Sequence, residues 1–244
     1  MLSALTNDSG KSEIYQQKIY EYGVLMNKLF CLICCATLIG LSFASETSTF
    51  LNEAVFKNKH AGIFVDIGAY DGIYANNTYF FEQNLGWTGV CVEPLPSAYA
   101  RLTHNRKCTC RSEAIAKNSG RREFVQVYGP NQFDMLSGFN DTFQAWVTVN
   151  HQDMHGAGWR LIMVPTITLN DLCKKNSITH IDYLSINTQG SETEIITSVD
   201  FTTVAIDVIS VDNPFKIPTI DSRLTAHGYT LIKRFGTCDI YSKI

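Results

Sequence analysis

The chain has 244 residues, of which 45% are hydrophobic, and a formal net charge of −3 at pH 7. This length fits one domain with an appendage, and 14 Phe and 11 Tyr are ample for one core, which excludes a disordered chain. The slight negative charge gives no electrostatic case for nucleic acid, because neutralising phosphates requires a clustered Lys and Arg surface. The basic residues nearest to such a cluster alternate with apolar ones, which predicts a solvated helix face and its exit turn: Arg101, Arg106, Lys107 and Arg111.

Residues 29–44 form an uncharged, apolar segment near the N-terminus. Lys28 precedes it, and the small residues Ser42 and Ala44 stand at positions −3 and −1 of a candidate cleavage site. This pattern predicts a secretory signal peptide or an uncleaved membrane anchor over residues 26–44. A buried core helix is the alternative, although the segment has no polar face at helical spacing.

The N-terminal segment also sets the predicted domain boundaries. Residues 1–25 are a polar extension, and Met26 is a candidate for the true start of translation. Residues 45–59 are then a lead-in, and residues 60–244 the folded domain. We expect the protein to be exported or attached to a membrane through residues 29–44, with a cytoplasmic location as the alternative.

From residue 60 the sequence alternates short apolar runs with helical stretches, which is typical of a parallel α/β sheet. Strands are predicted at residues 63–67, 88–93, 109–115, 122–128, 161–164, 181–187, 204–211, 229–235 and 239–243. Helices are predicted at 77–85, 97–105, 169–176 and 219–227, and Ser97 is the predicted cap of the second. Another helix is predicted to begin in a capping box of Ser191 and Glu194. The pattern indicates a doubly wound, Rossmann-like sheet whose final hairpin provides one antiparallel strand.

A long polar stretch, residues 128–159, interrupts this regularity and is typical of a lid or a substrate surface. It contains His151, Asp153 and His155. Histidine is the side chain best suited to removing a proton near neutral pH, so His151 is a candidate catalytic base. A hydrated polar loop is the alternative. We predict no metal site, because no third ligand accompanies the two histidines.

Five cysteines lie outside the apolar segment, and their odd number precludes a fully paired set of disulfides: Cys91, Cys108, Cys110, Cys173 and Cys238. Cys91 falls inside an apolar run, where a small buried residue is expected.

The glycine-containing turn after the first predicted strand is the clearest candidate for a ligand site. Ligands of doubly wound sheets bind at the carboxyl ends of the strands, and Gly68 allows the backbone to approach a ligand closely. Asp66 ends the first strand, where its carboxylate can interact with an ammonium group of a ligand. Glu93 ends the second strand, where its carboxylate can accept hydrogen bonds from both hydroxyls of a ribose. A nicotinamide site is disfavoured, since the second and third glycines of that motif are replaced by Tyr70 and Ile73.

The run from residue 63 to 108 resembles the FkbM-like methyltransferases, through D-x-G-A-x-D-G from Asp66, Asn77-Thr78 and V-E-P at 92–94. A second block, residues 181–213, is similar to later motifs of the family. The resemblance implies a class I methyltransferase sheet of about seven strands. It also implies S-adenosylmethionine as cofactor and O-methylation of a hydroxyl on a sugar, a glycan or a small molecule. The implied cofactor-binding residues are Asp66, Gly68, Ala69, Tyr70, Gly72, Asn77 and Glu93.

The sequence departs from the family pattern after the predicted strand 181–187. The family has Ser-x-Asp-x-Glu-Gly there, whereas this chain has Asn187 and Gln189 in place of the two carboxylates. Amides keep the shape and the hydrogen bonding of carboxylates but cannot act as general bases. Because they stand where the family has its two carboxylates, we count Asn187 and Gln189 with His151 as candidate catalytic residues. The alternative is a binding module that has kept the fold and lost or weakened its activity.

Overall fold

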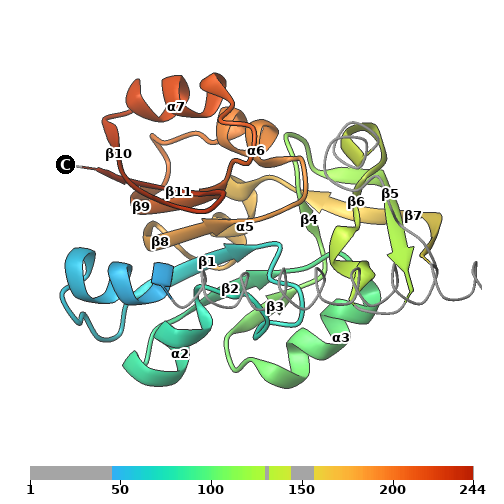
Figure 1. Cartoon of the computed structure of the whole chain (residues 1–244), viewed down its shortest axis with the longest axis horizontal. Helices are drawn as coiled ribbons and strands as arrows, with labels where there is room; N and C mark the ends of the chain where they lie inside the picture. The colour runs from blue at the N-terminus through green and yellow to red at the C-terminus, as the bar shows by residue number, and fades with distance from the viewer. Residues whose placement is uncertain (1–45, 130–131, 144–156, 244) are drawn as a thin grey trace, which may run out of the picture. The chain divides into compact units, whose positions relative to one another are not determined.

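The computed structural model describes residues 46–129, 132–143 and 157–243, whose main sheet has seven strands in the order β10-β11-β9-β8-β1-β2-β3 (Figure 1). Its strands are β1 (Ile63–Ile67), β2 (Thr88–Val92), β3 (Thr109–Arg111), β8 (His180–Ile186), β9 (Ala205–Asp212), β10 (Tyr229–Phe235) and β11 (Cys238–Lys243). Parallel pairs join β3, β2, β1, β8 and β9, whereas β11 is antiparallel to both β9 and β10. The predicted doubly wound sheet with one antiparallel strand is therefore confirmed.

Helices cover both faces of this sheet, because its central strands are apolar on both sides. Val65 packs in a cluster with one set of helices, and its neighbour Phe64 in a cluster with the other set. The first set comprises α5 (Leu169–Lys175), α6 (Glu192–Ser198) and α7 (Pro218–Thr225). The second comprises η1 (Leu51–Val55), α2 (Tyr79–Leu85) and α3 (Pro96–Asn105) (Figure 1).

The lead-in residues contribute to this core. Leu51 of η1 is fully buried in the cluster on the α2–α3 face. The ring of Phe56 packs edge-on against Phe81 and Trp87, at centroid distances of 5.5 and 4.8 Å. Residues 46–59 thus close one face of the sheet.

A second, four-stranded sheet has the order β4-β7-β5-β6. It contains β4 (Ala114–Ile115), β5 (Gly120–Tyr128), β6 (Gly138–Phe139) and β7 (Gly158–Ile167). The strands predicted at 122–128 and 161–164 are both longer in the structure, and they pair antiparallel as β5 and β7. The prediction of one strand over 109–115 is wrong: β3 ends at Arg111, and the chain enters the second sheet at Ala114. Glu113, between them, is held by ion pairs with Arg111 and Lys175 instead of by strand pairing.

Two predicted helix caps are also wrong. Helix α3 begins at Pro96, whose fixed φ suits the first helical turn, so Ser97 lies inside the helix. Ser191 precedes α6 but makes no capping bond, and its hydroxyl donates to Thr188 Oγ1 at 2.8 Å. Glu194 instead accepts two hydrogen bonds of 2.9 Å from Arg122 of β5. The predicted capping box is therefore replaced by the interaction of Glu194 with Arg122 of the second sheet.

In the described part of the chain, no helix is both long and apolar enough to cross a membrane. The predicted extension 1–25 and the predicted segment 29–44 lie outside the described residues, so export or membrane attachment stays a prediction.

Candidate cofactor site

A pocket lies at the carboxyl ends of β1, β2 and β8, the edge at which doubly wound sheets bind ligands. The second sheet supplies a further wall through Phe124 and Phe139. Six of the seven predicted cofactor residues line the pocket: Asp66, Gly68, Ala69, Tyr70, Asn77 and Glu93. Asn187 and Gln189 line it as well, whereas His151 lies outside the described residues.

The turn after β1 is held between the two neighbouring strands. The amides of Gly68 and Ala69 donate to the carbonyl of Val92 at 3.0 and 3.1 Å. From the other side, the amide of Asn187 donates to the carbonyl of Ile67 at 2.9 Å. Gly68 has a φ of +80°, and a Cβ added there would lie 1.8 Å from the backbone oxygen of Asn187. Only glycine fits this position.

Replacing Gly68 with Ala is expected to lower the free energy of unfolding by more than about 2 kcal/mol, through the clash and the strained φ together. Gly86 is a matched control, because its φ is +65° and a Cβ added there meets nothing within 4 Å. Gly86→Ala should cost only the strain, about 1–2 kcal/mol. Urea denaturation of both variants measures the difference, and equal losses would contradict the role of the Asn187 contact.

Glu93 presents a buried carboxylate at the end of β2. Its Oε2 accepts the amide of Tyr70 at 2.9 Å, and its Oε1 accepts the amide of Leu95 at 2.8 Å. Burial raises the pKa of Glu93 to about 7, against the lowering effect of these two hydrogen bonds. Each carboxylate oxygen has a second lone pair, so Glu93 can also accept two hydroxyls from the pocket.

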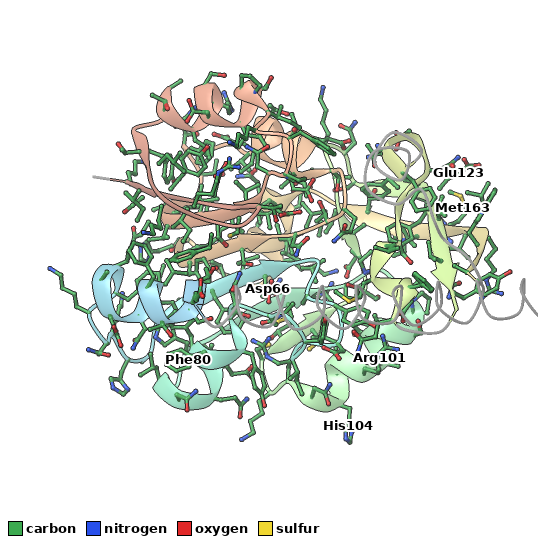
Figure 2. All side chains as sticks on the ribbon, in the orientation of Figure 1. Asp66, Phe80, Arg101, His104, Glu123 and Met163 are labelled. Atoms are coloured by element: carbon green, nitrogen blue, oxygen red, sulfur yellow. The ribbon has the colours of Figure 1, made fainter. Side chains whose placement is uncertain are left out.

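Asp66, labelled in Figure 2, belongs to a buried polar network with Asn76, Thr78 and Arg106. Its Oδ2 accepts hydrogen bonds of 2.7 Å from both Asn76 and Thr78, and Arg106 lies 4.0 Å away. Burial raises the pKa of Asp66, and the charge of Arg106 opposes this shift. The carboxylate therefore fixes the turn as well as lining the pocket.

Arg106 is the centre of that network, and its side chain is fully buried. It pairs with Glu82 and donates to the carbonyl of Gly72 at 3.0 Å and to Thr78 Oγ1 at 3.0 Å. The sequence predicted a solvated residue here, and that prediction is wrong, because the partners that bury Arg106 lie 24 to 34 residues away.

Gly72 is absent from the pocket lining, unlike the other predicted cofactor residues. A Cβ added at Gly72 would lie 2.6 Å from Cγ of Arg106 and 2.7 Å from Cδ1 of Leu102. The absence of a side chain at Gly72 therefore leaves space for the side chain of Arg106.

The short helix η2 (Phe133–Leu136) brings a residue to the pocket that the sequence did not single out. Asp134 accepts a hydrogen bond from the Tyr70 hydroxyl at 2.7 Å and pairs with Arg101 of α3 at 2.9 Å. The guanidinium of Arg101 also lies 4.9 Å from the centre of the Tyr70 ring. Because Asp134 lies in an irregular stretch, no periodic pattern pointed to it.

Two amides lie where the sequence departs from the family pattern. Gln189 Nε2 donates to Asn187 Oδ1 at 3.2 Å, so the two side chains lie together beside the pocket. Asn77 also lines the pocket, and its Oδ1 is buried and accepts no hydrogen bond from the described residues. An unsatisfied buried acceptor is costly, which makes Asn77 a position where a ligand donor would be stabilised.

A family model described as the Methyltransferase FkbM domain matches residues 66–231. No curated protein matches the chain. Among solved structures, the chain is similar to the methyltransferase FkbM from Methylobacillus flagellatus KT, at 13% identity and a TM-score of 0.45. That match covers 80% of this chain and 47% of the other, so this chain spans about half the length of its relative.

Two further similar structures are a precorrin-6y C5,15-methyltransferase from Geobacter metallireducens GS-15 and the human methyltransferase 10 domain containing protein. Their identities are 14% and 11%, with TM-scores of 0.40 and 0.41. The matches cover 82% and 83% of this chain, and 86% and 80% of the other chains. Since the family model matches more than half of the 244 residues, the chain belongs to the FkbM methyltransferase family.

Proposed function

We propose that this chain is an S-adenosylmethionine-dependent methyltransferase that methylates a hydroxyl of a sugar, a glycan or a small molecule. The observation that carries the proposal is the Glu93 carboxylate, which faces a pocket beside a turn held open by Gly68. Membership of the methyltransferase family supports the same activity.

The residues of the pocket fit the cofactor. Glu93 would accept the two ribose hydroxyls, and a carboxylate oxygen of Asp66 would face the ammonium group. Asn77 Oδ1 offers a buried acceptor without a partner among the described residues, and Gly68 and Ala69 leave the backbone open to the ligand. The cofactor supplies a methyl group bonded to a sulfonium.

The chain must align an acceptor hydroxyl with that methyl group and remove the hydroxyl proton. Asn187 and Gln189 line the pocket, but an amide cannot take up the proton. Asp66 and Glu93 are assigned to the ammonium group and the ribose of the cofactor in this proposal. The remaining candidates for the base are Asp134, the other carboxylate among the described lining residues, and His151. The two amides also favour a second candidate function, a binding module with little or no turnover.

The test of transfer is the incorporation of a labelled methyl group into a panel of hydroxyl acceptors by the full chain. Asn187→Asp is expected to raise the rate about 100-fold, because it supplies a general base beside the pocket. Asn84→Asp, on the exposed side of α2, is a matched control and should leave the rate unchanged. No gain from Asn187→Asp would place the base elsewhere, and His151→Ala and Asp134→Asn would follow. A wild type and an Asn187→Asp variant that both bind the cofactor without transferring methyl would favour the binding module.

Cofactor affinity is expected to depend on the ionisation of Glu93. The ionised carboxylate can accept hydrogen bonds from both ribose hydroxyls, whereas in the protonated acid one of these acceptor sites is occupied by the proton. Because burial raises the pKa of Glu93 to about 7, the affinity should fall about tenfold per pH unit below that value and level off above it. Binding should also release a proton when the pH is below 7. Calorimetric titration at several pH values, in buffers of different ionisation enthalpy, measures both effects, and an affinity that rises on acidification would contradict the assignment.

A further inference from the structure

Three thiols meet on the α2–α3 face of the main sheet. Cys91 lies in β2, and its register partner in β3 is Cys110. Cys108 lies just before β3, and both Cys108 and Cys110 pack against the cluster that contains Cys91 on this face. The sulfur atoms of Cys91 and Cys108 are 3.5 Å apart. The Cys110 thiol instead donates to the carbonyl of Cys108, with 3.6 Å between sulfur and oxygen.

The two sulfurs in contact differ in exposure in a way that suits disulfide exchange. Cys91 is fully buried, whereas Cys108 is only partly buried. The neighbouring thiols of Cys110 and Cys91, together with the charge of Arg106, lower the pKa of Cys108 against the effect of its partial burial. The thiolate is the form that attacks a disulfide, so Cys108 is the attacking group and Cys91 the buried partner beside it.

We propose that Cys91 and Cys108 form a disulfide by exchange with a small-molecule disulfide such as oxidised glutathione. The Cys108 thiolate attacks one sulfur of glutathione disulfide, forms a mixed disulfide and releases the first glutathione thiolate. Cys91 then loses its proton and attacks the Cys108 sulfur, which releases the second glutathione thiolate. Two cysteine thiols are oxidised, one glutathione disulfide is reduced to two thiols, and the two cysteine protons pass to the released glutathione.

The bond would close a loop that contains all of α3 and the buried Arg106. Closing such a loop restricts the unfolded chain, so the oxidised protein should unfold at a higher temperature than the reduced one. Export through the predicted segment 29–44 would place the pair in an oxidising compartment. The chemistry of the pair is independent of methyl transfer and of cofactor binding.

Peptide mapping tests the pairing directly. The full chain is equilibrated with oxidised or reduced glutathione, its free thiols are alkylated, and the denatured protein is digested with trypsin. Cleavage after Lys and Arg leaves Cys91 in residues 60–101 and both Cys108 and Cys110 in residues 108–111. We expect oxidised glutathione to produce a cross-linked species of these two peptides that carries one alkylated cysteine, and reduced glutathione to remove it.

Two alanine variants identify the second cysteine of the bond. Cys110→Ala should keep the cross-link, whereas Cys108→Ala should lose it and should also lose the rise in Tm on oxidation. The wild-type map and the Cys110→Ala variant decide the matter even if Cys108→Ala fails to fold. A cross-link that survives in Cys108→Ala, a bond between Cys108 and Cys110, or full alkylation of both peptides in oxidised glutathione would each overturn the proposal.

Discussion

Replacing Glu93 with Ala is expected to weaken the binding of S-adenosylmethionine by at least about 100-fold. The variant loses a carboxylate that would accept both ribose hydroxyls, and charge-assisted hydrogen bonds of this kind contribute about 1.5–3 kcal/mol each. It also leaves the buried amides of Tyr70 and Leu95 without their acceptor, which loosens the turn that borders the pocket. Calorimetric titration of the purified full chain measures the loss.

Two further variants define the cause of that loss. Glu93→Gln keeps one oxygen acceptor and the side-chain volume, so its affinity should lie between those of the wild type and Glu93→Ala. Glu123→Ala removes an exposed carboxylate from β5 of the second sheet and should bind normally (Figure 2). Unchanged affinity in a folded Glu93→Ala variant would refute the assignment of Glu93 to the ribose.

Arg106→Ala is expected to lower the free energy of unfolding by about 3–5 kcal/mol, the largest effect on stability that we predict. The substitution removes the partner of Glu82 and of the buried Asp66, and it leaves the carbonyl of Gly72 without its donor. An uncompensated buried charge is expensive, whereas the intact network satisfies these groups together. Urea denaturation followed by circular dichroism provides the measurement.

Arg160→Ala is the matched control for this prediction. Arg160 lies exposed on β7 and donates to Gln126 at 2.9 Å, so its loss should cost no more than about 0.5 kcal/mol. A loss of similar size in both variants would mean that the network around Arg106 contributes no more than an ordinary surface contact.

Local patterns in the sequence predicted the main sheet and placed the turn after its first strand beside the pocket. The apolar run 63–67 and the turn at Gly68 are adjacent in the chain, and Glu93 directly follows the next strand, so the parallel sheet itself brings them together. The final hairpin was equally predictable, because both of its strands and its turn are contiguous.

The parts that the sequence did not predict depend on contacts between distant residues. Arg106 is buried because it contacts Glu82 and Gly72, which are distant in the sequence. The periodicity of α3 gives no indication of these contacts. The position of Asp134 beside the pocket likewise depends on its contacts with Tyr70 and Arg101, which are distant in the sequence. A capping box is a purely local pattern. At Glu194 it does not form, because this side chain makes an ion pair with Arg122 of the second sheet instead.

The most direct test of the account is the calorimetric titration of the full chain with S-adenosylmethionine and, separately, with its demethylated product. We predict micromolar binding of both ligands, because both contain the ribose and the ammonium group to which Glu93 and Asp66 are assigned. A folded chain that binds neither ligand would contradict the assignment of the pocket at the ends of β1, β2 and β8 to this cofactor.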